Sequence, residues 1–270
     1  MEGAPTGKST VRQAGKPAVR MNRNLRLPPA QDTRSTGRTK TAINWRVECA
    51  VVIPCFNEER TIEAVICETR ALLPTVIVVD DGSGDATAER AKQAGARVFR
   101  HPSNQGKGVA LHTGLEQART LGFAWALTLD GDGQHAPSDI PRFLDRAAAT
   151  GAALVVGNRM QEATQMPWLR RQVNRWMSCR LSQLAGRQLP DTQCGFRMIQ
   201  LEPWSQLDLR SERFEVESEY LMAFAEAGLA VEFVPIQVIY QAEHSKINPV
   251  RDTLRWFRWC RARRKQACVR

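Results

Sequence analysis

Short apolar runs alternate with amphipathic segments along much of the chain. Between the runs, apolar residues recur at helical spacing, as at Ile62, Val65 and Ile66, and Asn57 is placed to cap that helix. Apolar strands that alternate with helices form parallel sheets covered on both faces, so the pattern predicts an α/β fold with a mostly parallel sheet. Five runs are predicted to be buried strands, at 49–54, 76–79, 97–99, 123–129 and 153–156.

Polar clusters follow four of the predicted strands. In open α/β sheets, ligands bind outside the carboxyl ends of the strands, because those ends meet at one edge. Each cluster alone is typical of a turn, but their shared position predicts a single binding site. The clusters span residues 54–58, 80–85, 130–134 and 157–159.

The third cluster carries candidate metal ligands. Alternate residues at a strand end point the same way, so Asp130, Asp132 and Gln134 are predicted to converge on one hard cation, Mg²⁺ or Mn²⁺. Two carboxylates about 4 Å apart repel by roughly 4 kcal/mol at an effective dielectric near 20, which a divalent ion relieves. A plain polar loop is the alternative. An EF-hand is disfavoured, because His135 and Pro141 occupy its Gly and Glu positions.

Positive charge is concentrated at the two ends of the chain. The net charge is +10, of which residues 1–46 carry +8 and residues 251–270 carry +7, so the middle is acidic at −5. This distribution argues against nucleic-acid binding by the folded part. Residues 1–46 contain too few apolar side chains to bury, and we predict a disordered basic arm there.

Residues 249–270 are predicted to form a basic amphipathic helix. Trp and Arg in such a helix are typical of a membrane interface, although packing against its own domain is the alternative. The seven cysteines have no metal-ligand spacing, and no apolar run reaches the roughly 18 residues of a membrane span. We therefore expect a cytoplasmic protein, peripheral on the cytoplasmic face of the membrane. The apolar side of the helix comprises Val250, Thr253, Leu254, Trp256, Phe257 and Cys260.

Several motifs together resemble a known family. The sequences at 53–59 (IPCFNEE), 79–83 (VDDGS), 104–108 (NQGKG) and 130–135 (DGDGQH) resemble family-2 inverting glycosyltransferases of the A-type fold. The resemblance covers residues 48–248, and 47–248 is the predicted nucleotide-sugar domain. The sequences at 191–197 (DTQCGFR) and 244–247 (HSKI) resemble the dolichyl-phosphate mannose and glucose synthase branch.

This resemblance implies roles for individual residues. Asp132, Arg159 and Arg171 would be catalytic, with Arg159 meeting phosphate and Arg171 orienting the acceptor phosphate. Asn158 departs from the serine that the branch has before this arginine. Asp130, Asp132 and Gln134 would ligate the metal. The donor would be bound by Pro54, Phe56, Glu58, Val79, Asp81, Asp130, Gly131, Asp132 and, on loop closure, Lys246.

The expected reaction moves a hexose from a nucleotide diphosphate sugar, of GDP-mannose or UDP-glucose type, to a polyprenyl phosphate. A phosphate acceptor with a second pKa near 6 is largely dianionic and needs no general base. A hydroxyl acceptor on another lipid or a glycan would need one, and Asp191, Glu215 and Glu217 are the candidates. His135 and His244 are assigned no proton transfer. A non-catalytic nucleotide-sugar sensor or membrane adaptor is the alternative from a different class.

Overall fold

The computed structural model describes residues 43–161, 166–239 and 249–267. The strands are β1 Cys49–Cys55, β2 Val76–Asp80, β3 Arg97–Arg100, β4 Trp125–Thr128, β5 Leu154–Asn158, β6 Arg197–Gln200 and β7 Val231–Pro235. The helices are α1 Trp45–Glu48, α2 Ile62–Leu72, α3 Thr87–Gln93, α4 Lys107–Thr120, α5 Ile140–Thr150, α6 Trp168–Ala185, α7 Leu201–Ser205, α8 Val216–Glu226 and α9 Pro249–Ala267, with a 3₁₀ turn η1 at Pro137–Asp139.

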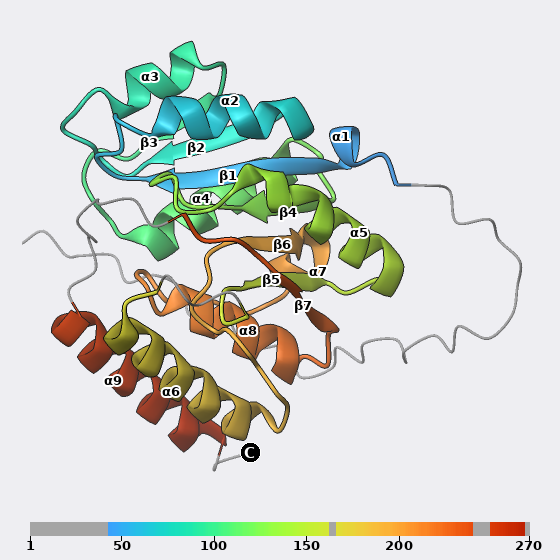
Figure 1. Cartoon of the computed structure of the whole chain (residues 1–270), viewed down its shortest axis with the longest axis vertical. Coiled ribbons are helices and arrows are strands. Elements are labelled where there is room, and N and C mark those ends of the chain that lie inside the picture. The colour runs from blue at the N-terminus through green and yellow to red at the C-terminus, as the bar shows by residue number, and fades with distance from the viewer. Residues whose placement is uncertain (1–42, 162–165, 240–248, 268–270) are drawn as a thin grey trace, which may run out of the picture. The chain divides into compact units, whose positions relative to one another are not determined.

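The seven strands form one sheet in the order β3-β2-β1-β4-β6-β5-β7 (Figure 1). β1 is buried along its whole length and pairs in parallel with β2 and β4. β3 continues the parallel group beside β2, and β5 pairs in parallel with β7. The five predicted strands are all present, and the predicted α/β fold with a mostly parallel sheet is confirmed.

β6 runs antiparallel to both of its neighbours, β4 and β5. The apolar pattern predicts no strand after residue 156, whereas the structure adds β6 and β7. β6 (RMIQ) and β7 (VEFVP) are short and include polar residues, so neither forms a continuous apolar run. Because β6 runs in the opposite direction, it begins where β4 and β5 end, and Arg197 pairs with both Thr128 and Val156. The segment before β6 is thereby carried to the carboxyl edge of the sheet.

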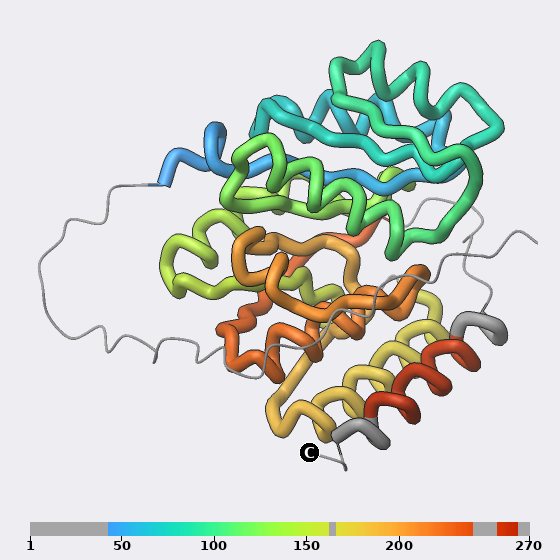
Figure 2. Tube along the Cα trace, turned by 180° about the vertical axis from the view of Figure 1, so that it is seen from behind, coloured from blue at the N-terminus to red at the C-terminus, as the bar shows by residue number. Residues whose placement is uncertain are grey.

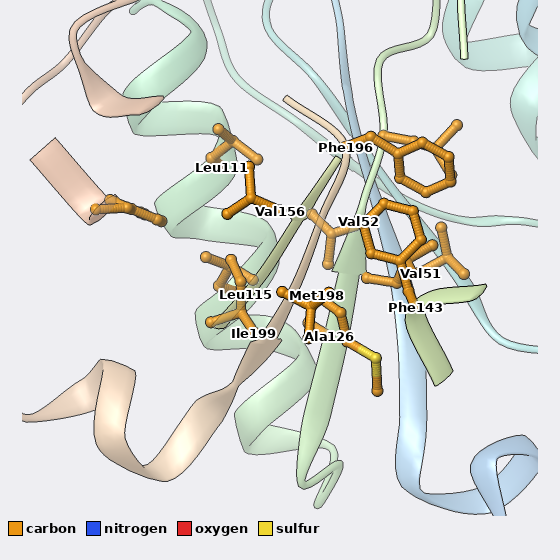
Figure 3. Packing of buried hydrophobic residues seen from close by; sticks show 14 of the residues in the cluster. Val51, Val52, Leu111, Leu115, Ala126, Phe143, Val156, Phe196, Met198 and Ile199 are labelled. Atoms are coloured by element: carbon orange, nitrogen blue, oxygen red, sulfur yellow. The ribbon is translucent and has the colours of Figure 1, made fainter. Parts of the chain in front are cut away.

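Helices cover both faces of the sheet. α2 and α5 lie on one face, and α4 and α8 lie on the other (Figures 1 and 2). Figure 3 shows Leu111 of α4 on one side of the strands, with Phe143 and Phe196 on the opposite side. The Phe143 and Phe196 rings are stacked with centroids 4.3 Å apart. A Cβ on Gly114 would lie 2.3 Å from Val52 Cγ1, so the glycine allows α4 to pack close to β1.

The predicted C-terminal helix is present as α9, which lies beside α6 (Figures 1 and 2). The Trp176 ring contacts Trp256 and Phe257, with centroids 5.6 and 4.9 Å away. Trp256 is 3% exposed and donates its indole N–H to Ser218 Oγ at 2.9 Å. The predicted apolar side is therefore divided: Trp256 packs inward, while Leu254 and Phe257 are exposed.

Two sequence predictions fall largely or wholly outside the described residues. These are the basic arm 1–46, apart from 43–46, and Lys246. Among the helices that the structure describes, none combines the length and the apolar composition needed to span a membrane.

Candidate active site

The carboxyl ends of β1, β2, β4 and β5 and the start of β6 meet at one edge of the sheet. The loops that follow β1 and β2 are joined directly. The Asn57 backbone N–H donates to Ser83 Oγ at 2.8 Å, and the Asn57 side-chain oxygen accepts from Gly84 N–H at 2.9 Å. The predicted helix cap at Asn57 is wrong, because α2 begins at Ile62 and Asn57 has a φ of 53°. Its polar groups instead tie two site loops together.

Asp80 and Asp81 end β2 and are both almost fully buried, at 0% and 3% exposure. Asp80 Oδ1 accepts from both the N–H and the hydroxyl of Ser83. Its Oδ2 lies 3.1 Å from Arg100 Nε. Asp80 therefore acts as an internal support for the loop after β2.

Asp81 organises the next loop. Its Oδ1 accepts from His101 Nδ1 at 2.7 Å and from Gln105 N–H at 2.9 Å, and its Oδ2 accepts from Gly106 N–H at 2.8 Å. Buried carboxylates are stable when such donors replace water. The contacts that the structure gives Asp81 position the 104–106 loop, and its contact with a nucleoside stays a prediction.

The other predicted nucleoside residues differ in exposure. Val79 is fully buried and pairs with Pro54, which is also buried. Phe56 and Glu58 are half-buried, in the loop that follows β1. The backbone N–H of Glu58 donates to Thr87 Oγ1 at 2.8 Å, which fixes this loop to the start of α3. Pro54 and Val79 thus lie in the buried sheet, whereas Phe56 and Glu58 are partly accessible, and the contact of all four with a nucleoside stays a prediction.

Asp130 and Asp132 follow β4 and have different surroundings. Asp130 Oδ1 lies 2.7 Å from Lys107 Nζ. Asp132 Oδ1 accepts from Gln134 N–H at 3.0 Å. Burial would raise the pKa of Asp130, but the Lys107 ammonium lowers it to about 2. Burial and the nearby Asp130 charge raise the pKa of Asp132 above its usual range. Among the residues that the structure describes, Asp132 thus has no ion-pair partner, whereas Asp130 is paired with Lys107.

His135 is a structural residue of this loop. It is 4% exposed, its ring packs on Phe196 with centroids 5.2 Å apart, and Nδ1 accepts from Asp130 N–H at 3.2 Å. Accepting at Nδ1 places the proton of the neutral ring on Nε2, and burial lowers the pKa of His135. The ring thus holds the Asp130 backbone in place.

The donor set fits a hard divalent cation. Mg²⁺ is usually held by one or two carboxylates together with substrate phosphates, and a cation relieves the repulsion that raises the pKa of Asp132. In the part of the chain that the structure describes, no cluster of three His, Cys, Asp or Glu side chains forms a complete metal site. Two carboxylates are a ligand number that Mg²⁺ accepts when phosphate oxygens and waters complete its coordination. Gln134 is half-buried beside them, and its ligand role stays a prediction.

Arg159 and Asp191 form a buried two-point ion pair. Arg159 Nε lies 2.7 Å from Asp191 Oδ2, and Nη2 lies 2.9 Å from Oδ1. The backbone N–H groups of Arg159 and Gln193 also donate to this carboxylate, each at 3.1 Å. Burial would raise the pKa of Asp191, but Arg159 holds it below its usual range. Asp191 is thus unsuited to be a general base, and it fixes the position of Arg159.

Lys107 and Glu217 form a second buried ion pair that sequence reasoning misses. Lys107 Nζ lies 2.8 Å from Glu217 Oε1 as well as 2.7 Å from Asp130. Glu217 is 5% exposed. The sequence contains one signal, a lysine between Gly106 and Gly108. Added Cβ atoms there would lie 2.5 Å from Glu212 O and 2.2 Å from Ser211 O, so glycine is required where this loop meets the segment before α8.

Glu215, the remaining candidate base, and Glu219 of α8 also have partners. Glu215 lies 3.4 Å from Arg255 Nε of α9, and Glu219 accepts from the backbone N–H groups of Arg210 and Ser211. The structure therefore gives all three predicted candidate bases, Asp191, Glu215 and Glu217, cationic partners. Arg171 lies near the start of α6 and is half-buried, and its role toward the acceptor stays a prediction.

The sheet order, the antiparallel β6 and the acidic edge define a class of protein, the A-type glycosyltransferases. A crystal structure of Mycobacterium tuberculosis glucosyl-3-phosphoglycerate synthase with Mn²⁺, UDP and phosphoglyceric acid is similar to this chain, with a TM-score of 0.60 and 23% identity. The match covers 78% of this chain and 74% of that one. At this identity the similarity establishes the fold.

The family follows from the sequence comparison. Residues 50–206 match the model of Glycosyl transferase family 2, and the chain belongs to this family. It is 32% identical to the UDP-N-acetylglucosamine–dolichyl-phosphate N-acetylglucosaminyltransferase of Methanococcus voltae, over 70% of this chain and 85% of that protein. It is 27% identical to the polyprenol monophosphomannose synthase of Mycolicibacterium smegmatis, over 67% and 72% of the two chains.

Proposed function

We propose that the protein transfers a hexose, with inversion, from a nucleotide diphosphate sugar of GDP-mannose or UDP-glucose type to a polyprenyl phosphate at a membrane surface. The family supports the transferase activity. Relatives named as dolichyl-phosphate and polyprenol-phosphate sugar transferases support the acceptor. The names of those relatives specify different sugars, and a transfer assay with several donors identifies the sugar that this protein uses.

One observation favours a phosphate acceptor over a hydroxyl. Asp191, Glu215 and Glu217 are each paired with a cation, and Asp191 has a lowered pKa. A hydroxyl nucleophile needs a base that can take its proton, whereas a phosphate dianion attacks without one. The site therefore suits an acceptor that brings its own negative charge.

The proposed roles follow from position. Asp130, Asp132 and Gln134 would hold Mg²⁺ or Mn²⁺, which when bound supplies charge stabilisation to the leaving diphosphate. Phe56 and Glu58 would contact the nucleoside, together with Pro54 and Val79. Arg159, fixed by Asp191, would present charge to phosphate oxygens. The predicted phosphate contacts of Arg171 and Lys246 complete the set.

Membrane attachment is proposed for the surface formed by α6 and α9. Six of the ten exposed large hydrophobic residues in the described part of the chain lie on these two helices. Basic residues of the same helices would attract anionic lipid, each contributing on the order of 1 kcal/mol. The surface thus extends the sequence prediction from α9 alone to a helix pair. The six residues are Trp168, Leu169, Trp176, Leu184, Leu254 and Phe257.

The proposed function is tested by incubating the full chain with GDP-mannose, UDP-glucose or UDP-N-acetylglucosamine and a polyprenyl phosphate, with Mg²⁺ or Mn²⁺. Products are identified by mass spectrometry. We expect one donor to give a glycosylated lipid phosphate, and a chelator to abolish it.

Other outcomes point to the alternatives. If the donor sugar were transferred only to a hydroxyl group of a lipid or glycan, the acceptor would be that hydroxyl compound and not a polyprenyl phosphate. Donor binding without transfer to any acceptor would favour a sensor or adaptor.

A further inference from the structure

Lys107 forms an ion pair with one carboxylate oxygen of Asp130, which is a predicted metal ligand. Its Nζ lies 2.7 Å from Asp130 Oδ1, and its side chain is 16% exposed. The ammonium is shared between Asp130 and Glu217, so a metal ion approaching the Asp130–Asp132 pair meets the positive charge of Lys107 already bound to Asp130. An ammonium and a divalent cation therefore compete for the same carboxylate.

The surrounding structure keeps Lys107 in this position. Glu217 Oε1 holds the ammonium from the other side at 2.8 Å, and the Phe214 ring centroid lies 5.9 Å from Nζ. A Cβ on Gly195 would lie 3.0 Å from both Asp130 Oδ2 and Lys107 Nζ, so a larger residue there would crowd the ion pair. The loop before β6 thus leaves space for the contact between Lys107 and Asp130.

Glu217 also lines a small buried cavity, together with Arg197. Its second oxygen, Oε2, and Arg197 Nη1 are buried and make no hydrogen bond to any residue that the structure describes. Both residues line a cavity of about 10 Å³, close to the volume needed for one water. Arg197 is 2% exposed. The Arg197 guanidinium and the Glu217 carboxylate therefore lie at the same buried cavity.

We propose that Lys107 makes metal binding at Asp130 and Asp132 conditional on the donor diphosphate, with Glu217 as its positioning residue. An ammonium has three N–H donors, and in the described part of the chain Asp130 and Glu217 accept two of them. A diphosphate oxygen would accept the third and draw positive charge away from Asp130. The diphosphate would also supply oxygen ligands to the metal, in addition to those of the two carboxylates. Metal and nucleotide then bind with positive coupling, and each raises the affinity for the other by the same factor.

This inference rests on the proposed function, because it assumes a nucleotide diphosphate donor. It concerns metal affinity, which can be measured without any sugar transfer. Metal binding in the absence of nucleotide should be weak, and removal of the ammonium should strengthen it.

The test compares two variants that differ only at residue 107. Lys107→Met alone would leave Glu217 buried without its partner, which is strongly destabilising. Glu217→Gln keeps the ammonium on Asp130, and Lys107→Met/Glu217→Gln removes the ammonium together with its buried partner. Mn²⁺ binding to both variants and to the wild type is measured by electron paramagnetic resonance, alone and with UDP or GDP. Thermal unfolding checks that the variants are folded.

We expect UDP or GDP to tighten Mn²⁺ binding to the wild type by at least about tenfold, within the usual range of coupling between sites. Without nucleotide, the double variant should bind Mn²⁺ about tenfold more tightly than Glu217→Gln does, and its coupling to nucleotide should be smaller. Equal or weaker binding by the double variant, with coupling intact in the wild type, would overturn the inference alone. Absence of Mn²⁺ binding to the wild type with either nucleotide would count against the proposed function as well.

Discussion

Two acidic pairs lie at the carboxyl ends of β2 and β4, on either side of β1, and the protein surrounds them differently. The Asp80–Asp81 pair ends β2 and is enclosed by its own donors, namely Ser83, Arg100, His101 and two backbone N–H groups. The Asp130–Asp132 pair follows β4, and within the described ranges Asp130 alone of the two has a cationic partner. The first pair is part of the scaffold. The second pair retains a charge that a ligand can balance.

The difference shows that an acidic motif at a strand end does not by itself identify a metal site. In the sequence, Asp80-Asp81 and Asp130-Gly131-Asp132 are equally acidic. What separates them is the supply of donors from the rest of the fold. The loop at 101–106 folds back over Asp81, whereas the raised pKa of Asp132 reflects burial beside another carboxylate. Two substitutions, measured in three ways, sharpen or break this comparison.

The largest effect is expected from Asp132→Asn. Loss of a metal ligand removes several kcal/mol of transition-state stabilisation, so the transfer rate should fall by about 10³-fold. The measurement is product formation with saturating donor, acceptor and Mn²⁺, with the exposed Glu63→Gln of α2 as control. A loss of less than tenfold would mean that Asp132 does not hold a catalytic metal.

Asp81→Asn should act on stability. In the wild type, the backbone N–H groups of Gln105 and Gly106 donate to the two carboxylate oxygens of Asp81. In the variant, an amide NH₂ group, which cannot accept a hydrogen bond, would replace one of these oxygens. Charge-assisted hydrogen bonds contribute about 1.5–3 kcal/mol each, so the free energy of unfolding should fall by about 2–3 kcal/mol in urea titrations. Asp208→Asn is the matched control, because its ion pair with Arg210 is exposed and should contribute less than about 1 kcal/mol. Unchanged stability of Asp81→Asn would break the comparison.

The smallest effect, and one of opposite sign, is expected from Asp132→Asn without metal. The pKa of Asp132 is raised in the folded state, so the stability that its protonated form contributes at low pH is lost as the pH rises through that pKa. At neutral pH the variant should therefore be slightly more stable than the wild type. The difference should vanish on acidification, when Asp132 of the wild type is protonated too.

Urea titrations of metal-free protein at a series of pH values measure this third effect. A variant that is less stable than the wild type at neutral pH would show that Asp132 is balanced by the protein after all. In that case the contrast with the Asp80–Asp81 pair would disappear.

Part of the site is predictable because it depends on local pattern. The residues after β1, β2 and β4 are predictable because each follows an apolar run that ends in a polar cluster. A buried strand must be apolar, and the backbone N–H and C=O groups beyond its end need hydrogen-bond partners. The pairings are not predictable in this way. Asp191 and Glu217 are candidate bases by sequence, but Arg159 and Lys107 neutralise them in the fold. The residues next to either acid in the sequence do not indicate which basic residue it pairs with.

The sequence by itself determines the alternation of strands and helices as far as β5, the acidic residues at the edge and the helical C-terminus. These features follow from periodicity and composition within short segments. The tertiary structure decides the antiparallel placement of β6 between β4 and β5, which carries Asp191 to Arg159 and Gly195 to Asp130. It also turns Trp256 inward and joins Lys107 to Glu217. Such contacts depend on which distant segments share a buried volume, and a local pattern does not encode that.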